Sequence, residues 1–143
     1  MEEKHTLAAY RVLRIAYGVV PLVAGLDKFT NLLTDWKMYL SPLAVRLLPV
    51  RPETFMRFAG IVEIAVGLAI LLGFARIFGW IAMAWLAAIA LNLLGTGAFF
   101  DVAARDAVMA CGAFALAELA RVHEPAGARR RVPTPAREAG AHA

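Results

Sequence analysis

The feature that most constrains this fold is the stretch from Arg76 to Asp101, because no residue between these two carries a charge. It contains the run IFGWIAMAWLAAIALNLLG, in which Asn92 is the one strongly polar side chain. A helix needs about 20 apolar residues to cross a hydrocarbon core roughly 30 Å thick. A buried helix of a soluble bundle would instead show polar residues on its outer face. We therefore predict a helix that crosses a membrane.

Three further apolar stretches accompany it, and together they predict an all-α, integral membrane four-helix bundle. Hydrophobic residues make up 61% of the 143 residues, above the roughly 45–50% of soluble domains. We expect the four spans at residues 7–26, 55–74, 77–95 and 102–120, within one transmembrane domain covering residues 1–121.

Two segments lie outside these spans. Between the first and second spans, residues 27–54 place Phe29, Leu32, Trp36 and other apolar residues at helical spacing, which predicts an amphipathic helix lying at the membrane interface. Residues 122–143 are rich in arginine, alanine and proline, so we expect a disordered basic tail.

The net charge of +4 comes mostly from basic residues near helix ends and in the tail. In such places they orient the chain and meet lipid headgroups, so the bilayer and not nucleic acid is the expected partner. With four spans both termini lie on the same side of the membrane, and that side carries more basic residues than the other. We therefore expect a multi-pass protein of the bacterial inner membrane with both termini in the cytoplasm.

Glu63 stands out among the residues that could carry chemistry, because it lies well inside the second span. A carboxylate there costs about 2.5–3.5 kcal/mol even on lenient insertion scales, so it must be protonated, paired or next to water. It could anchor a ligand, together with Asn92, Tyr17 and Arg14, or carry a proton. It could equally make a structural pair, with Tyr17 or Arg14 as the partner.

A second polar cluster is expected near the outer face, formed by Asp27, Lys28, Arg105 and Asp106. These side chains could close an ion-paired lid over the bundle or bind a polar headgroup, and the lid is favoured.

Small residues predict where the helices pack, because close contact between small side chains holds helices together in lipid. The fourth span carries Ala107, Cys111 and Ala115 four residues apart, and the second carries Gly60 and Gly67. We expect these five residues to form helix contacts. As the only cysteine, Cys111 can form no disulfide within the chain.

Other chemistry finds no support in the sequence. The three histidines, His5, His123 and His142, lie outside the expected spans, and no metal-binding cluster or phosphate-binding loop appears. We predict no intrinsic cofactor and no metal.

Several short motifs resemble those of the DoxX family of small bacterial four-helix membrane proteins. They are GLDKF after the first span, GIVEIAVGLAILLGF in the second, a short hairpin at Arg76 and RDAVMACGAFALAEL in the fourth. The matching positions are Gly25, Lys28, Gly60, Glu63, Gly67, Arg105 and Asp106. The resemblance implies a four-helix bundle, and some members are subunits of a thiosulfate:quinone oxidoreductase or associate with redox-defence partners. The more distant vitamin K epoxide reductases use cysteine pairs, which this chain lacks.

We therefore expect an accessory subunit of a larger, quinone-linked respiratory or redox complex, or a homo-oligomer, that is not catalytic alone. A quinone would bind only at a site shared with a partner. The alternative is a small-molecule or lipid carrier with a cavity around Glu63. Loss of ligand binding in the isolated Glu63→Gln protein would favour the carrier.

Overall fold

The computed structural model describes residues 1–124, and in this part of the chain every regular element is helical. The all-α prediction is confirmed for these residues. The elements are α1 (Glu2–Thr30), a 3-10 turn η1 (Trp36–Tyr39), α2 (Pro42–Leu47), α3 (Pro52–Leu71), α4 (Ala75–Leu94) and α5 (Phe100–His123).

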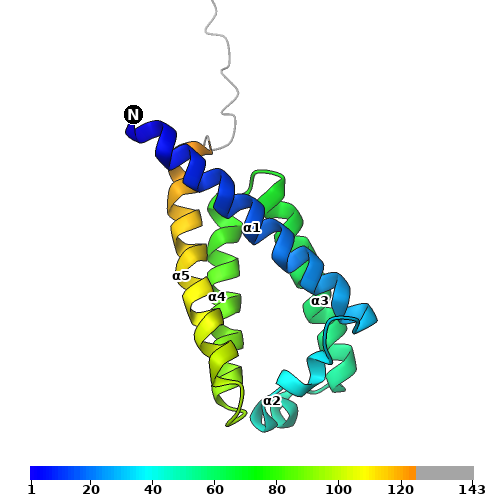
Figure 1. The fold of residues 1–143 in the computed structure, drawn as a ribbon. Coiled ribbons are helices and arrows are strands. Elements are labelled where there is room, and N and C mark those ends of the chain that lie inside the picture. The colour runs from blue at the N-terminus through cyan, green and yellow to red at the C-terminus, as the bar shows by residue number, and fades with distance from the viewer. Residues whose placement is uncertain (125–143) are drawn as a thin grey trace, which may run out of the picture.

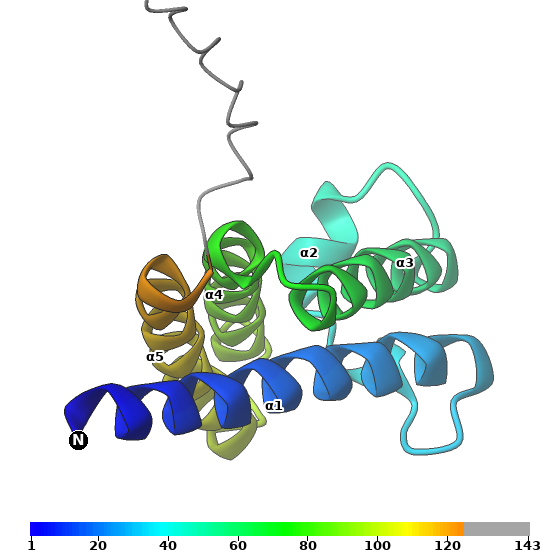
Figure 2. The same ribbon diagram turned by 90° about the horizontal axis from the view of Figure 1, so that it is seen from above.

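The four long helices form two pairs, α1 with α3 and α4 with α5. The pairs meet at the end of the molecule that carries the α3–α4 turn, and they diverge toward the other end (Figure 1). Seen from above, α5, α4 and α3 follow one another in a row, and α1 runs along one side of it (Figure 2). The buried apolar core, which includes Tyr10, Ile70 and Leu116, joins the pairs where they meet.

Glycines bring α1 and α3 into backbone contact. Gly18 lies opposite Gly67 and Gly25 lies opposite Gly60, as expected for two antiparallel helices whose glycines are seven residues apart. A Cβ added at Gly67 would lie 2.5 Å from the carbonyl oxygen of Gly18, and one at Gly60 would lie 2.7 Å from that of Gly25. Gly60 and Gly67 are therefore packing residues of the α1–α3 pair.

Alanines dominate the contact between α4 and α5. On α5 most of the buried side chains follow alternating steps of three and four residues, the spacing that keeps one face of a helix toward its neighbour; they are Ala103, Asp106, Ala110, Ala113, Ala117 and Ala120, and Leu116 is buried beside them. Ala107 and Cys111 are exposed, and Ala115 is half-buried. The predicted packing face at Ala107, Cys111 and Ala115 is therefore wrong for the contacts within this chain.

The error has a geometric cause. Residues exactly four apart advance by about 40° per step around a helix of 3.6 residues per turn. A stripe that begins at buried Ala103 has therefore rotated to the exposed side by Ala107 and Cys111.

Two side chains cap the helix ends on either side of the short α3–α4 turn. Arg14 donates to the carbonyl oxygens of Ile70 and Leu71 at the end of α3, over 3.0 and 2.5 Å. Glu124 accepts from the backbone N–H groups of Ala75 and Arg76 at the start of α4, both at 3.0 Å. Each charge lies at the helix end whose dipole it complements.

The helix α5 extends beyond the expected end of the transmembrane domain at residue 121. Val122 and His123 continue α5, and the Glu124 carboxylate also accepts a 2.5 Å hydrogen bond from the Tyr10 hydroxyl. Residues 125–143, the remainder of the predicted tail, lie outside the described residues.

The segment between α1 and α3 differs from the single amphipathic helix that was predicted. Asn31 adopts the left-handed conformation with φ 51° and ends α1, and only the short elements η1 and α2 follow. Pro42 starts α2, and Ser41 caps it by accepting from the Ala44 N–H. The positive φ at Asn31 ends the helix, so the apolar residues of this segment do not share the face of one continuous helix.

Three of the long helices, α1, α3 and α4, are long and apolar enough to cross a membrane. Among the described residues α5 does not meet the same criterion, because charged residues such as Arg105, Asp106 and Glu118 interrupt it. With 29 residues, α1 is about 43 Å long at 1.5 Å per residue, longer than the hydrocarbon core is thick.

Candidate functional site: a buried ion pair within the α1–α3 helix pair

Lys28 and Glu63 form a buried ion pair between α1 and α3. The Lys28 Nζ lies 2.6 Å from Glu63 Oε2, and both side chains are less than a tenth exposed. A Cβ added at Gly60 would lie 3.2 Å from the Lys28 Cβ, so the lack of a side chain at Gly60 brings Lys28 close to α3, within reach of Glu63. Breaking such a pair would leave one buried charge without compensation.

Two tryptophans complete the surroundings of the pair. The Trp85 Nε1–H, on α4, donates to Glu63 Oε1 at 3.2 Å. The Trp36 ring, on η1, lies 3.7 Å from the Lys28 ammonium, a cation–π contact. Both carboxylate oxygens of Glu63 therefore have a donor, and Trp85 links the α1–α3 pair to α4.

Asp27 organises the turn that follows α1. Its carboxylate accepts from Trp36 Nε1 at 2.7 Å and from the backbone N–H groups of Leu32 and Leu33 at 2.9 and 3.1 Å. These bonds hold the Trp36 ring in place over the neighbouring Lys28. Asp27 thus positions the Trp36 ring, which covers the Lys28 side of the ion pair.

Asp106 supplies a further buried carboxylate from α5. It accepts from the Nε–H of Arg105 at 3.2 Å, although the Arg105 side chain is 66% exposed. Of the predicted outer cluster, Arg105 thus binds Asp106, whereas Lys28 binds Glu63 and Asp27 binds its own turn.

The other residues named with Glu63 lie elsewhere. Arg14 caps α3, the Tyr17 hydroxyl donates to the Met109 carbonyl oxygen at 2.6 Å, and Asn92 accepts from Ser41 N and donates to the Tyr39 carbonyl oxygen. The expectation that Tyr17 or Arg14 pairs with Glu63 is therefore wrong. Lys28 pairs with Glu63 instead of lying at the outer surface, because α1 is longer than a span of 20 residues and the lysine side chain reaches inward.

Sequence reasoning missed Trp36, Trp85 and Glu124. For the tryptophans a signal existed: a buried carboxylate needs donors, and an indole N–H is one of the few donors available in an apolar stretch. Glu124 had no such signal, because it lies in a stretch whose composition resembles the tail.

Chemically, the arrangement suits a structural connector. Lys28 and Trp85 occupy both carboxylate oxygens of Glu63, and removal of either charge of the ion pair would leave the other buried without compensation. Among residues 1–124, no group of three or more His, Cys, Asp or Glu side chains is placed to hold a metal ion.

Comparison with known proteins places the chain in a family. The DoxX family profile matches residues 9–104, two thirds of the chain, from α1 to the start of α5 and including Lys28, Glu63 and Trp85. No curated protein and no solved structure matches the chain. The family match and the three long apolar helices together identify this chain as a membrane protein of the DoxX family.

Proposed function

We propose that this chain is an accessory subunit of the bacterial inner membrane that completes a larger, quinone-linked redox complex and catalyses nothing alone. The proposal rests on the charges of α5 and on its exposed small side chains. This helix is the one long helix of the described chain with too many charges to qualify as a span, and it leaves Ala107 and Cys111 exposed. A partner helix on that face would cover it.

The physical argument for a partner comes from helix association in lipid. Small side chains let two helix backbones approach closely, and close packing replaces the hydrophobic drive that lipid does not provide. The α5 face offers Ala104, Ala107 and Cys111, all exposed. Ionisable side chains in a lipid-exposed helix are costly, and a protein neighbour lowers that cost.

The ion pair supports a subunit over a catalyst or a carrier. Both Glu63 oxygens are engaged by donors from α1 and α4, so the carboxylate serves to join helices. The carrier alternative needs a cavity at Glu63, and Glu63 lines neither of the two cavities described for this chain.

The family supplies the class of complex. Some DoxX members are subunits of a thiosulfate:quinone oxidoreductase, and this chain matches the family across most of its helices. We propose that α1, α3, α4 and α5 all cross the membrane as a four-helix bundle, with both termini in the cytoplasm and any quinone held at a surface shared with the partner.

A crosslinking experiment tests the proposal in native membranes. A photoreactive amino acid replaces Cys111 in the full chain, and a matched chain carries it at Ala88, which is exposed on α4. We expect a discrete crosslinked protein from position 111, identified by mass spectrometry as a redox subunit, and far less from position 88. Crosslinks to lipid alone at both positions would contradict the accessory role, and crosslinks only to a second copy would show a homo-oligomer instead.

The packing argument has its own test. The pair Ala107→Leu and Cys111→Leu adds bulk to the α5 face, and the pair Ala84→Leu and Ala88→Leu adds the same bulk to exposed positions of α4. Copurification of the partner in mild detergent should be lost with the α5 pair and kept with the α4 pair. If the α5 pair retains the partner, this face is not the interface.

A further inference from the structure

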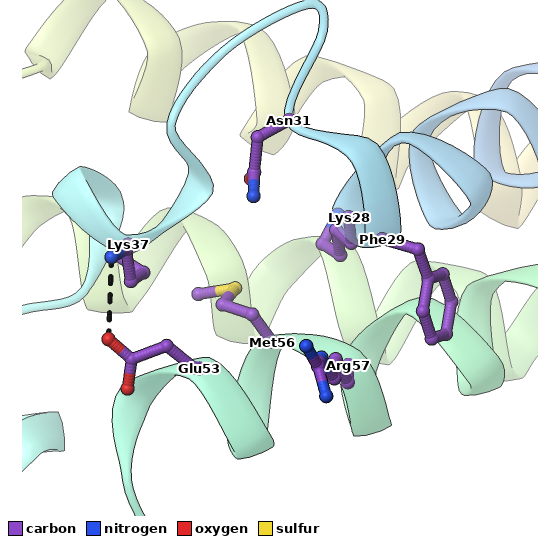
Figure 3. A pocket seen from close by; sticks show the side chains of 7 residues that line it. All are labelled: Lys28, Phe29, Asn31, Lys37, Glu53, Met56 and Arg57. Carbon is purple, nitrogen blue, oxygen red and sulfur yellow. Dashed lines mark hydrogen bonds and ion pairs between the residues drawn. The ribbon is translucent and has the colours of Figure 1, made fainter.

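A small cavity of about 90 Å³ lies where the end of α1, η1 and the start of α3 come together. Figure 3 shows the side chains that surround it. It is lined by Lys28, Phe29, Asn31, Lys37, Glu53, Met56 and Arg57. Three of these seven residues are basic and one is acidic.

The ion pairs leave one of these cations free for a ligand. Lys28 is committed to Glu63, and Lys37 lies 3.3 Å from Glu53 in a pair whose side chains are both more than 40% exposed. Arg57 has no ion-pair partner among residues 1–124. The exposed Lys37–Glu53 pair is weak and can open for a stronger anion.

The surrounding segment strengthens the positive potential. Between Asn31 and Arg57 the chain carries Lys37, Arg46, Arg51 and Arg57 against Asp35 and Glu53, a net charge of +2. Arg51 is near enough to Glu53 for its charge to act on that carboxylate. An anion entering the cavity therefore meets more positive than negative charge.

Asn31 adds a neutral donor. Its left-handed backbone is held by the hydrogen bond from its own N–H to the Asp27 carbonyl oxygen, 2.6 Å long. From this turn the side-chain amide points into the space between Lys28 and Lys37 (Figure 3). An amide N–H and a guanidinium on different walls can bind the oxygens of one tetrahedral anion.

Size and location narrow the ligand class. A cavity of about 90 Å³ is small and suits a compact polar group such as a phosphate. Pockets for drug-sized ligands usually measure about 300–1,000 Å³. Exposed apolar residues follow two of the lining residues in the chain: Leu32 and Leu33, 84% and 69% exposed, come after Asn31, and Phe58, 59% exposed, comes after Arg57. Cationic and apolar side chains meet in this way at the headgroup level of a bilayer.

We propose that this cavity binds a phosphate group, with Arg57, Lys37 and Asn31 as its ligands and an anionic lipid headgroup or free phosphate as its source. Leu32 and Leu33 would contact acyl chains when the phosphate belongs to a lipid. The site is independent of the α5 face and of any partner protein.

Native mass spectrometry of the full chain in mild detergent tests the proposal with phosphatidylglycerol as the probe. The test variant is Arg57→Gln, and the control is Arg46→Gln, which removes the same charge from α2 outside the cavity. We expect Arg57→Gln to weaken phosphatidylglycerol binding roughly tenfold, as for the loss of one charge-assisted hydrogen bond. Arg46→Gln should change it less than about twofold, because it removes only diffuse charge.

Competition with inorganic phosphate then distinguishes the two sources. Displacement of the lipid by phosphate would show that the site accepts the free anion, and retention of the lipid would assign the site to headgroups; either result supports a phosphate site. Equal losses in Arg57→Gln and Arg46→Gln, or no loss in either, would overturn the proposal. Circular dichroism and melting temperature without lipid should match the wild type in both variants, because both side chains are exposed.

Discussion

The two helix pairs are built from different contacts. In the α1–α3 pair, glycines face each other and the carbonyl oxygens of Gly18 and Gly25 touch the opposite helix. In the α4–α5 pair, alanine side chains form most of the buried surface, and Gly79 faces the Cβ of Ala117. The first pair also contains a buried ion pair.

The difference indicates where the fold is specific. A contact between backbones, with one charge opposite another, tolerates one register only, because a shift would separate Lys28 from Glu63. A contact between alanine side chains can adjust by small movements. We therefore expect substitutions in the α1–α3 pair to have larger effects than comparable ones in α4–α5.

The largest expected effect is that of Glu63→Leu, which leaves Lys28 charged and buried. The loss should be about 3–5 kcal/mol of unfolding free energy in mixed detergent micelles, as for other broken buried pairs. Glu53→Leu is the matched control, because its pair with Lys37 is exposed, and should cost less than about 1 kcal/mol. Similar losses of unfolding free energy in the two variants would show that burial does not determine how much an ion pair contributes to stability.

The next effect compares one added methyl group in each helix pair. Gly67→Ala places a Cβ 2.5 Å from the Gly18 carbonyl oxygen, whereas Gly79→Ala places one 2.9 Å from the Ala117 Cβ. We expect Gly67→Ala to cost about 1–3 kcal/mol, since two backbones must separate. Gly79→Ala should cost less in the same unfolding titration. A greater loss of unfolding free energy for Gly79→Ala would show that the α4–α5 pair is the more sensitive of the two to substitution.

The helix caps at the α3–α4 turn should contribute less. Arg14→Ala removes two hydrogen bonds to the end of α3, and Glu124→Ala removes two from the start of α4. Each should lower the unfolding free energy by about 1–2 kcal/mol. The control is Arg11→Ala, because Arg11 is exposed on the same helix as Arg14. If Arg11→Ala and Arg14→Ala lower the unfolding free energy equally, Arg14 does not stabilise α3 by capping it.

The smallest effect belongs to the exposed face of α5. Ala107→Leu with Cys111→Leu should change the stability of the isolated chain by less than about 0.5 kcal/mol, because both positions are exposed. Ala110→Leu with Ala117→Leu should destabilise it by about 1–3 kcal/mol per site, because both side chains are buried. Thermal melting of the two double variants in one detergent makes the comparison. A larger loss from the exposed pair would mean that α5 packs through its other face.

Apolar runs in the sequence predicted the all-α fold and the approximate location of each long helix, because hydrophobic length is a property of the sequence itself. Glu63 was singled out for the same reason, as a charge in an apolar run. Its partner was missed because the Lys28–Glu63 contact depends on how α1 and α3 approach each other, which Gly25 and Gly60 fix in three dimensions.

The segment after α1 was less predictable. Its apolar spacing is helical, but Asp27 binds the backbone of Leu32 and Leu33 and the Trp36 indole, which favours a turn over a continued helix. On α5 the four-residue spacing of small side chains pointed to the wrong face, because a stripe with that period winds around the helix. Local sequence patterns do not contain this tertiary information.

A double-mutant cycle at Lys28 and Glu63 is the sharpest test of whether these two buried charges serve to join helices. We expect Lys28→Met and Glu63→Leu each to be strongly destabilising in mixed micelles, and the double variant to recover most of the loss, with a coupling of at least about 2 kcal/mol. Additive losses, with no recovery in the double variant, would show that the two charges do not act as a pair and that the ion pair does not join α1 to α3.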